Sequence, residues 1–115
     1  MVLTPQIESL IQRLLTLSKE GKVDWEETVV EQKFLAALSK YVVTIEEGTW
    51  NGLHYDLEVS DQFGRVIDAV SVTPEFKSGT EPFDKLGELH ALARRRALKA
   101  DASLSDFLSD LAAIH

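Results

Sequence analysis

Polar residues that could bind a metal ion alternate along one predicted strand. His54, Asp56 and Glu58 are two residues apart, so a strand would place all three on one face. Asp68, on the next predicted strand, could point the same way. Imidazole nitrogens and carboxylate oxygens are common ligands of divalent cations. The solvated face of an antiparallel strand shows the same alternation, so we predict no metal site and no cofactor and keep these four residues as the alternative.

A second pattern would suit magnesium-dependent cleavage of a phosphodiester. An acid, Asp56 or Asp61, is followed along the chain by Glu75-Phe76-Lys77. This order resembles the motif of the restriction-endonuclease-like nucleases. The resemblance implies that an acid and Glu75 hold magnesium while Lys77 orients the attacking water. Against it, we expect Pro74 to end the strand before the motif. A nuclease is therefore the alternative to a protein without enzymatic activity.

The charge distribution bears on the kind of partner. The net charge is −7, whereas binding to nucleic acid or anionic lipid requires an excess of Lys and Arg, so we expect neither partner. Arg94, Arg95 and Arg96 lie near the end of a predicted helix, where cations suit the negative helix end. These arginines could also bind an acidic partner. The acidic remainder of the chain leaves a third alternative, an acidic chaperone or immunity-type protein that binds a basic partner.

The first element that would position these residues is an N-terminal helix over residues 5–20. Thr4 suits the N-cap, Pro5 suits the first helical position, and Gly21 is a helix stop. The apolar residues recur at spacings of three and four, which predicts one buried stripe. These residues are Ile7, Leu10, Ile11, Leu14 and Leu17.

The segment after this helix leads into the strands. Asp24 to Glu27 places a capping acid three residues before a glutamate, which predicts a short helical turn, with Trp25 closing the end of the core. Apolar residues then alternate over 33–38, a possible extra short strand, and over 41–47. The alternation changes phase at Ser39-Lys40. We expect a bulge or bend there, and whether the two segments form one bent strand or two stays open.

The hydrophobic alternation predicts a three-stranded antiparallel meander. An exposed loop over Gly48 to Gly52 would pair Ile45 with Tyr55 and keep the apolar residues of both strands on one face. Asp61 to Gly64 predicts a three-residue hairpin turn with a left-handed glycine, which sets Val59 against Ile67. The residues left on the other face of the sheet are Val66, Val70 and Val72.

Two helices are predicted after the sheet, which gives the order α-β-β-β-α-α. One covers Phe83 to Ala97, and the other begins near Ser103, which forms a capping box with Asp106. The last helix carries a broad apolar stripe of Leu104, Phe107, Leu108, Leu111 and Ile114. It either covers the second face of its own sheet or packs on another subunit. We predict a homodimer, or binding to a protein partner, with Val66, Val70, Val72, Phe107 and Leu111 in the interface.

Size and composition bound the class of protein. The 115 residues are 44% hydrophobic and 27% charged, values typical of a single globular domain over residues 1–115. The absence of cysteine excludes disulfides and thiolate sites. The first residues lack the basic region of a signal peptide, and no apolar run is long enough to span a membrane. We expect an α+β domain in the cytoplasm, without membrane contact.

Three segments together carry a resemblance. Lys19 to Thr28 reads K-x-G-K-x-x-W-E-x-T, Tyr41 to Ile45 reads Y-x-V-x-I, and Leu89 to Arg95 reads L-x-x-x-A-R-R. With the meander between them, they resemble small uncharacterised bacterial proteins and accessory domains. The resemblance implies no catalytic residues. We interpret the chain as a non-enzymatic interaction or accessory module that self-associates.

Overall fold

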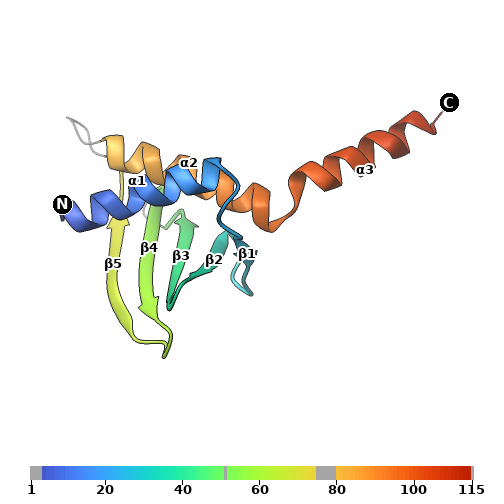
Figure 1. Cartoon of the computed structure of the whole chain (residues 1–115). Coiled ribbons are helices and arrows are strands. Elements are labelled where there is room, and N and C mark those ends of the chain that lie inside the picture. The colour runs from blue at the N-terminus through green and yellow to red at the C-terminus, as the bar shows by residue number, and fades with distance from the viewer. Residues whose placement is uncertain (1–3, 51, 75–79, 115) are drawn as a thin grey trace.

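The computed structural model describes residues 4–50, 52–74 and 80–114, and it has the predicted α+β class (Figure 1). The first helix is α1 (Pro5–Lys19). Five strands follow: β1 (Glu26–Glu27), β2 (Lys33–Leu38), β3 (Tyr41–Gly48), β4 (His54–Asp61) and β5 (Val66–Val72). The last two helices are α2 (Thr80–Ala97) and α3 (Ala100–Ala112). The prediction of three strands was wrong, because β1 and β2 extend the meander; β2 is the possible extra strand over 33–38.

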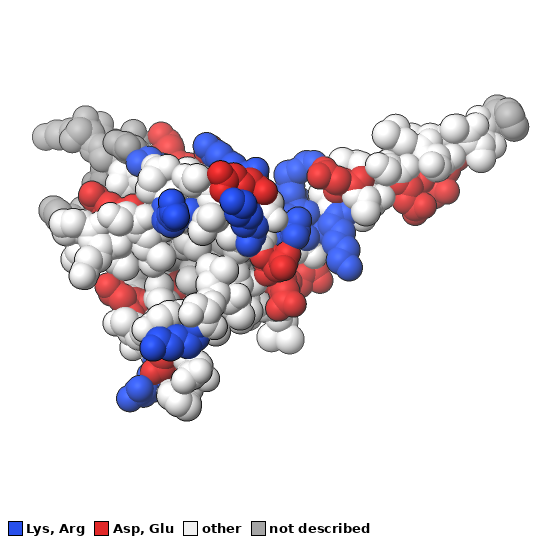
Figure 2. All heavy atoms as spheres, in the orientation of Figure 1, with Lys and Arg blue, Asp and Glu red and all other residues white. Residues whose placement is uncertain are grey.

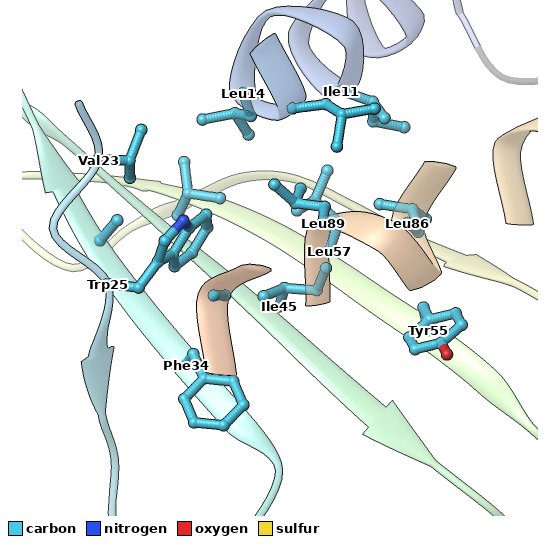
Figure 3. Packing of buried hydrophobic residues seen from close by; sticks show 14 of the residues in the cluster. Ile11, Leu14, Val23, Trp25, Phe34, Ile45, Tyr55, Leu57, Leu86 and Leu89 are labelled. Atoms are coloured by element: carbon cyan, nitrogen blue, oxygen red, sulfur yellow. The ribbon is translucent and has the colours of Figure 1, made fainter. Parts of the chain in front are cut away.

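The five strands form one antiparallel sheet in chain order. Alternate residues of a strand point to opposite faces, and the buried residues of β2 to β5 share one face. Both α1 and α2 lie on that face, and Figure 3 shows their side chains pointing towards Ile45 and Leu57 of the sheet. The sheet is therefore covered on one side. The core residues of the two helices are Ile7, Ile11, Leu14, Leu15, Leu86, Leu89 and Ala93.

Local sequence signals explain α1. Thr4 is the N-cap, and its hydroxyl accepts a hydrogen bond from the Ile7 amide at 3.2 Å. Pro5 occupies the first turn, where its missing N–H costs nothing. Gly21 follows the helix with a φ of +72°, which glycine adopts without steric cost. The predicted helix is confirmed, with its end one residue earlier.

The segment 24–27 differs from its prediction. Glu26 and Glu27 pair with Leu35 and Phe34 as an edge strand, so the expected helical turn is wrong. Strand pairing is favoured over a capped helical turn because Trp25 enters the core beside β1. Trp25 is 3% exposed, and its indole N–H donates to the Ser18 hydroxyl at 3.0 Å. Its expected position at the end of the core is confirmed.

Residues 33–38 and 41–48 are two strands joined by a tight turn, and the expected bulge or bend is wrong. Leu38 pairs with Tyr41 across the two turn residues, Ser39 and Lys40. Residues that pair directly share a face, so a two-residue turn itself changes the phase of the alternation. Ser39 has a φ of +58°, as the first central residue of a type II′ turn requires.

The β3–β4 connection is a wide loop, as predicted, but the register differs by two residues. Ile45 pairs with Leu57 rather than Tyr55, and the ladder continues to Gly48 and His54. Longer strands add backbone pairing, and a shift of two keeps every side chain on its expected face.

The β4–β5 hairpin has the predicted turn and a different register. The Gly64 amide donates to the Asp61 carbonyl at 3.1 Å, and Gly64 has a φ of +85°. Beyond the turn, Val59 pairs with Asp68 rather than Ile67, because the pairing shifts by one residue between Val59 and Ser60. The predicted second face is therefore wrong for Val70 and Val72 and right for Val66, which pairs with Ser60 on the uncovered face. Val70 and Val72 lie opposite Leu57 and Tyr55 on the helix-covered face.

The C-terminal helix starts earlier than predicted. α3 begins at Ala100, so Ser103 and Asp106 lie inside the helix and form no capping box at its start. Lys99 precedes it in the left-handed conformation, with a φ of +53°. This residue redirects the chain, so α3 points away from the sheet and does not cover its second face (Figure 1). Among the described helices, none is long and apolar enough to cross a membrane.

Candidate protein-binding surface

The C-terminal helix α3 exposes a continuous apolar surface. None of its residues is buried, and the predicted stripe lies in solvent. Phe107 is 56% exposed and Leu108 is 65% exposed. Figure 2 shows uncharged atoms along one side of the projecting helix and acidic atoms along the other. Helix α3 therefore has an apolar side and an acidic side, as a helix that packs against another surface does, and within the described part of the chain no other element covers its apolar side.

The apolar residues of α3 follow a heptad pattern. Their spacings alternate between four and three residues, which is the repeat of positions a and d in a coiled coil. We call this set the seam: Ala100, Leu104, Phe107, Leu111 and Ile114. Leu108 lies beside the seam, at position e. The acidic residues Asp101, Asp106 and Asp110 occupy positions e, c and g, outside the seam. Such a seam buries its side chains when a second helix packs along it.

A groove lies at the base of α3, where it meets the end of α1 and the start of β1. We call it the junction groove. Trp25, Leu92, Ala97 and Ala100 contribute apolar surface to it. Its basic residues are Lys19, Arg95, Arg96 and Lys99, and its acidic residues are Asp24, Glu26, Glu27 and Asp101. The seam enters this groove through Ala100.

Two of the three arginines predicted to bind an acidic partner already have carboxylate partners. Arg95 pairs with Asp101 at the start of α3, and Arg96 pairs with Asp24 before β1. Within the described residues, Arg94 makes no ion pair, and it lines a shallow groove beside the turn over 28–32. All three arginines belong to the last turn of α2, where the helix dipole favours cations. Arg95 and Arg96 thus connect the start of α3 and β1 to α2.

A polar cluster missed by the sequence analysis lies between α2 and the sheet. The Nε2 atom of His90 lies 2.9 Å from the Gln32 carbonyl, which only accepts, so this nitrogen carries the proton. Its Nδ1 atom lies 3.8 Å from a carboxylate oxygen of Glu47. The Tyr55 hydroxyl donates to the same oxygen at 3.3 Å. Burial, followed by the nearby Glu47 carboxylate, raises the pKa of Tyr55 above its ordinary value.

This cluster is packed like a core rather than open like an active site. The His90 side chain is 4% exposed, and its ring lies 5.3 Å from the ring of Phe34 and 5.6 Å from that of Tyr55. His90 is therefore a buried polar residue of the core. The missed partner, Glu47, had a signal in the sequence, because it continues the inward alternation of Val43 and Ile45. The cluster joins α2 to β3 and to the turn before β2.

The structure divides the metal candidates between the two faces of the sheet. His54, Asp56 and Glu58 share the uncovered face of β4, where His54 Nε2 lies 3.4 Å from Asp56 Oδ2. Asp68 pairs with Val59 and so lies on the opposite face. Within residues 4–50, 52–74 and 80–114, no group of three or more such side chains is close enough to hold a metal ion.

The acids of the nuclease alternative are also separated. Asp56 lies on the uncovered face of β4, whereas Asp61, five residues later, lies at the turn on the other face. The remaining members of that motif, Glu75 and Lys77, lie outside the described residues. The motif pairs one of these two acids with Glu75, so that pairing lies outside the described residues.

No protein-family model, no curated protein and no solved structure matches this chain.

Proposed function

We propose that this protein is a non-enzymatic interaction module that self-associates through α3. The observation that carries the proposal is an amphipathic helix of 13 residues with no buried side chain. Isolated helices of this length are marginal in water, because few backbone hydrogen bonds offset the cost of nucleation. Packing of the seam against another surface would supply the missing stabilisation and cover the apolar side chains.

A second copy of the chain is the partner that the seam fits. Positions a and d of a coiled coil pack against the same positions of another helix, and α3 carries this pattern from Ala100 to Ile114. Two identical seams related by a two-fold axis complement each other without any further component. The proposal keeps Phe107 and Leu111 as binding residues and removes Val70 and Val72, which face the covered side of the sheet.

A competing apolar surface lies at the far end of the sheet. Tyr41, Phe63, Val66 and Ile67 are exposed there, beside Lys40 and Arg65. These residues belong to hairpins already held by the ladders of β2 to β5. Helix α3 lacks such support, so burial contributes more to its order than to that of the hairpins.

Sedimentation equilibrium of three proteins tests the proposal. We expect the wild type to be a dimer at micromolar concentration. Phe107→Glu with Leu111→Glu should be a folded monomer, because charges in the seam cannot be desolvated without a large penalty. Ser105→Glu with Ser109→Glu places the same two charges elsewhere on α3 and should stay dimeric.

Two results would contradict self-association through α3. One is a wild type that is monomeric throughout the micromolar range. The other is a seam variant that dimerises as well as the serine variant. Thermal melting of each protein shows whether α1, the sheet and α2 remain folded.

A further inference from the structure

We propose that the two copies pair antiparallel, so that the C-terminal turn of each α3 lies in the junction groove of the other copy. This proposal rests on self-association through α3 and specifies its geometry. It assigns an occupant to a groove that the proposed function alone leaves unexplained. Three features support it: the course of the seam, the distribution of charge, and the position of the rest of the molecule relative to α3.

The seam provides a register for antiparallel pairing. When residue numbers opposite each other sum to 211, Leu104 faces Phe107 of the second copy, and Ala100 faces Leu111 of the second copy. In this register α3 overlaps from Ala100 to Leu111, nearly its whole length, and the small Ala100 faces the larger Leu111, as interdigitated packing favours. Ile114 of the second copy then lies just beyond Ala100, at the base of α3, where α2 ends at Ala97. Ala97 and Ala100 both line the junction groove, so the end of the second helix enters it.

The charges favour the same direction. Helix α3 contains Asp101, Asp106 and Asp110 but no Lys or Arg, while basic residues gather at its base (Figure 2). Parallel pairing would place each acid of α3 level with the same acid of the second copy and leave Lys99 without an acid of the second copy near it. In the register above, Asp110 of the second copy lies opposite Asp101, whose carboxylate is already paired with Arg95, and two residues from Lys99, which makes no ion pair with the residues that the structure describes. Antiparallel pairing also directs the negative end of the second helix towards these cations.

The position of the remaining molecule points the same way. Helices α1 and α2 and the sheet all lie beyond the N-terminal end of α3 (Figure 1). A parallel pair would bring these two large parts together at one end of a helix of about 20 Å. In an antiparallel pair they lie at opposite ends, and each contributes a groove to the other copy's helix. The pairing then closes on itself as a two-fold dimer.

Cysteine cross-linking distinguishes the two directions, because the chain has no cysteine of its own. Ala100→Cys and Leu111→Cys are made separately and oxidised in a glutathione buffer, alone and as an equimolar mixture. Antiparallel pairing places the two Leu111 positions about 16 Å apart along the axis, too far for a disulfide. We expect cross-linked dimers in the mixture and almost none in either variant alone. Ala97→Cys with Ile114→Cys is a second pair, for use if Leu111→Cys weakens the dimer.

Sedimentation of the reduced proteins separates failure of this inference from failure of the proposed function. Cross-linking of each variant alone, in a protein that is dimeric, would overturn antiparallel pairing and leave self-association intact. A dimer that cross-links in no combination would also overturn it. A wild type that is monomeric would remove the proposed function and this geometry together.

Discussion

At the scale of single residues, Asp61 shows how one carboxylate organises a turn. It accepts hydrogen bonds from the backbone amides of Arg65 at 3.0 Å and Phe63 at 2.9 Å. The Arg65 guanidinium donates to its other oxygen at 2.8 Å. The backbone bond from Arg65 is the largest influence and lowers the pKa of Asp61, with further lowering by Phe63 and the Arg65 side chain against the opposing effect of burial.

This lowered pKa predicts a specific dependence of stability on pH. A carboxyl group whose pKa is lower in the folded state than in the unfolded state stabilises the protein when the pH is above its ordinary pKa of 3.8. This contribution is lost as the pH falls through the folded-state pKa. Asp61→Asn should therefore be less stable than wild type at pH 7, and the difference should shrink in acid. Urea unfolding between pH 7 and pH 3 measures it. Glu31→Gln, at an exposed position in another turn, is the control, and an equal effect of both changes would contradict the role of Asp61.

Individual residues differ in how far the sequence predicts their surroundings. Thr4 and Gly21 act through neighbours within a few positions, so their roles at the ends of α1 follow from local chemistry. His90 binds the carbonyl of Gln32, which is 58 positions away. Every residue has a backbone carbonyl, so residue types cannot predict which carbonyl accepts this hydrogen bond. Only the assembled fold shows this contact.

At the scale of elements, the β2–β3 hairpin contains a turn that its residue types do not predict. Ser39 and Lys40 are not the Asn-Gly or Asp-Gly pair that marks most two-residue turns. The phase change of the alternation was correctly detected, but it fits a bulge as well as a tight turn. The ladder from Lys33 to Leu38 decides between them, because pairing six residues with β3 is more favourable than one continuous bent strand.

Ser39 is therefore a position where substitution should raise stability. Its φ of +58° costs an L-residue free energy that glycine does not incur. After the greater flexibility of glycine in the unfolded chain is subtracted, Ser39→Gly should gain about 0.5–1 kcal/mol in unfolding free energy. Ser39→Val should lose about 1 kcal/mol or more, because a β-branched residue avoids this conformation.

Chemical denaturation of the Ser39 variants measures these changes. Lys40→Gly is the matched control, since Lys40 has no positive φ and glycine there should only destabilise. A gain from Lys40→Gly together with a loss from Ser39→Gly would contradict the proposed turn.

At the scale of the whole molecule, α3 gives the protein its elongated shape of 55 × 37 × 26 Å. The sequence predicted an apolar stripe on this helix and left open where the stripe packs. Hydrophobic spacing defines which residues need a partner, whereas direction depends on the left-handed backbone of Lys99 and on the Arg95–Asp101 ion pair. Neither is visible in a pattern of apolar residues. The stripe leaves its own sheet, and we propose that a second copy covers it.

Amide hydrogen exchange, followed as a function of protein concentration, tests most directly whether a second copy holds α3. We predict that the amides of residues 100–112 become more protected as the concentration rises, because helix order follows dimer formation. Amides of β3 and β4 should keep the same high protection throughout, which provides the internal control. Rapid exchange of α3 at every concentration would contradict self-association, as would protection of α3 that does not change with dilution.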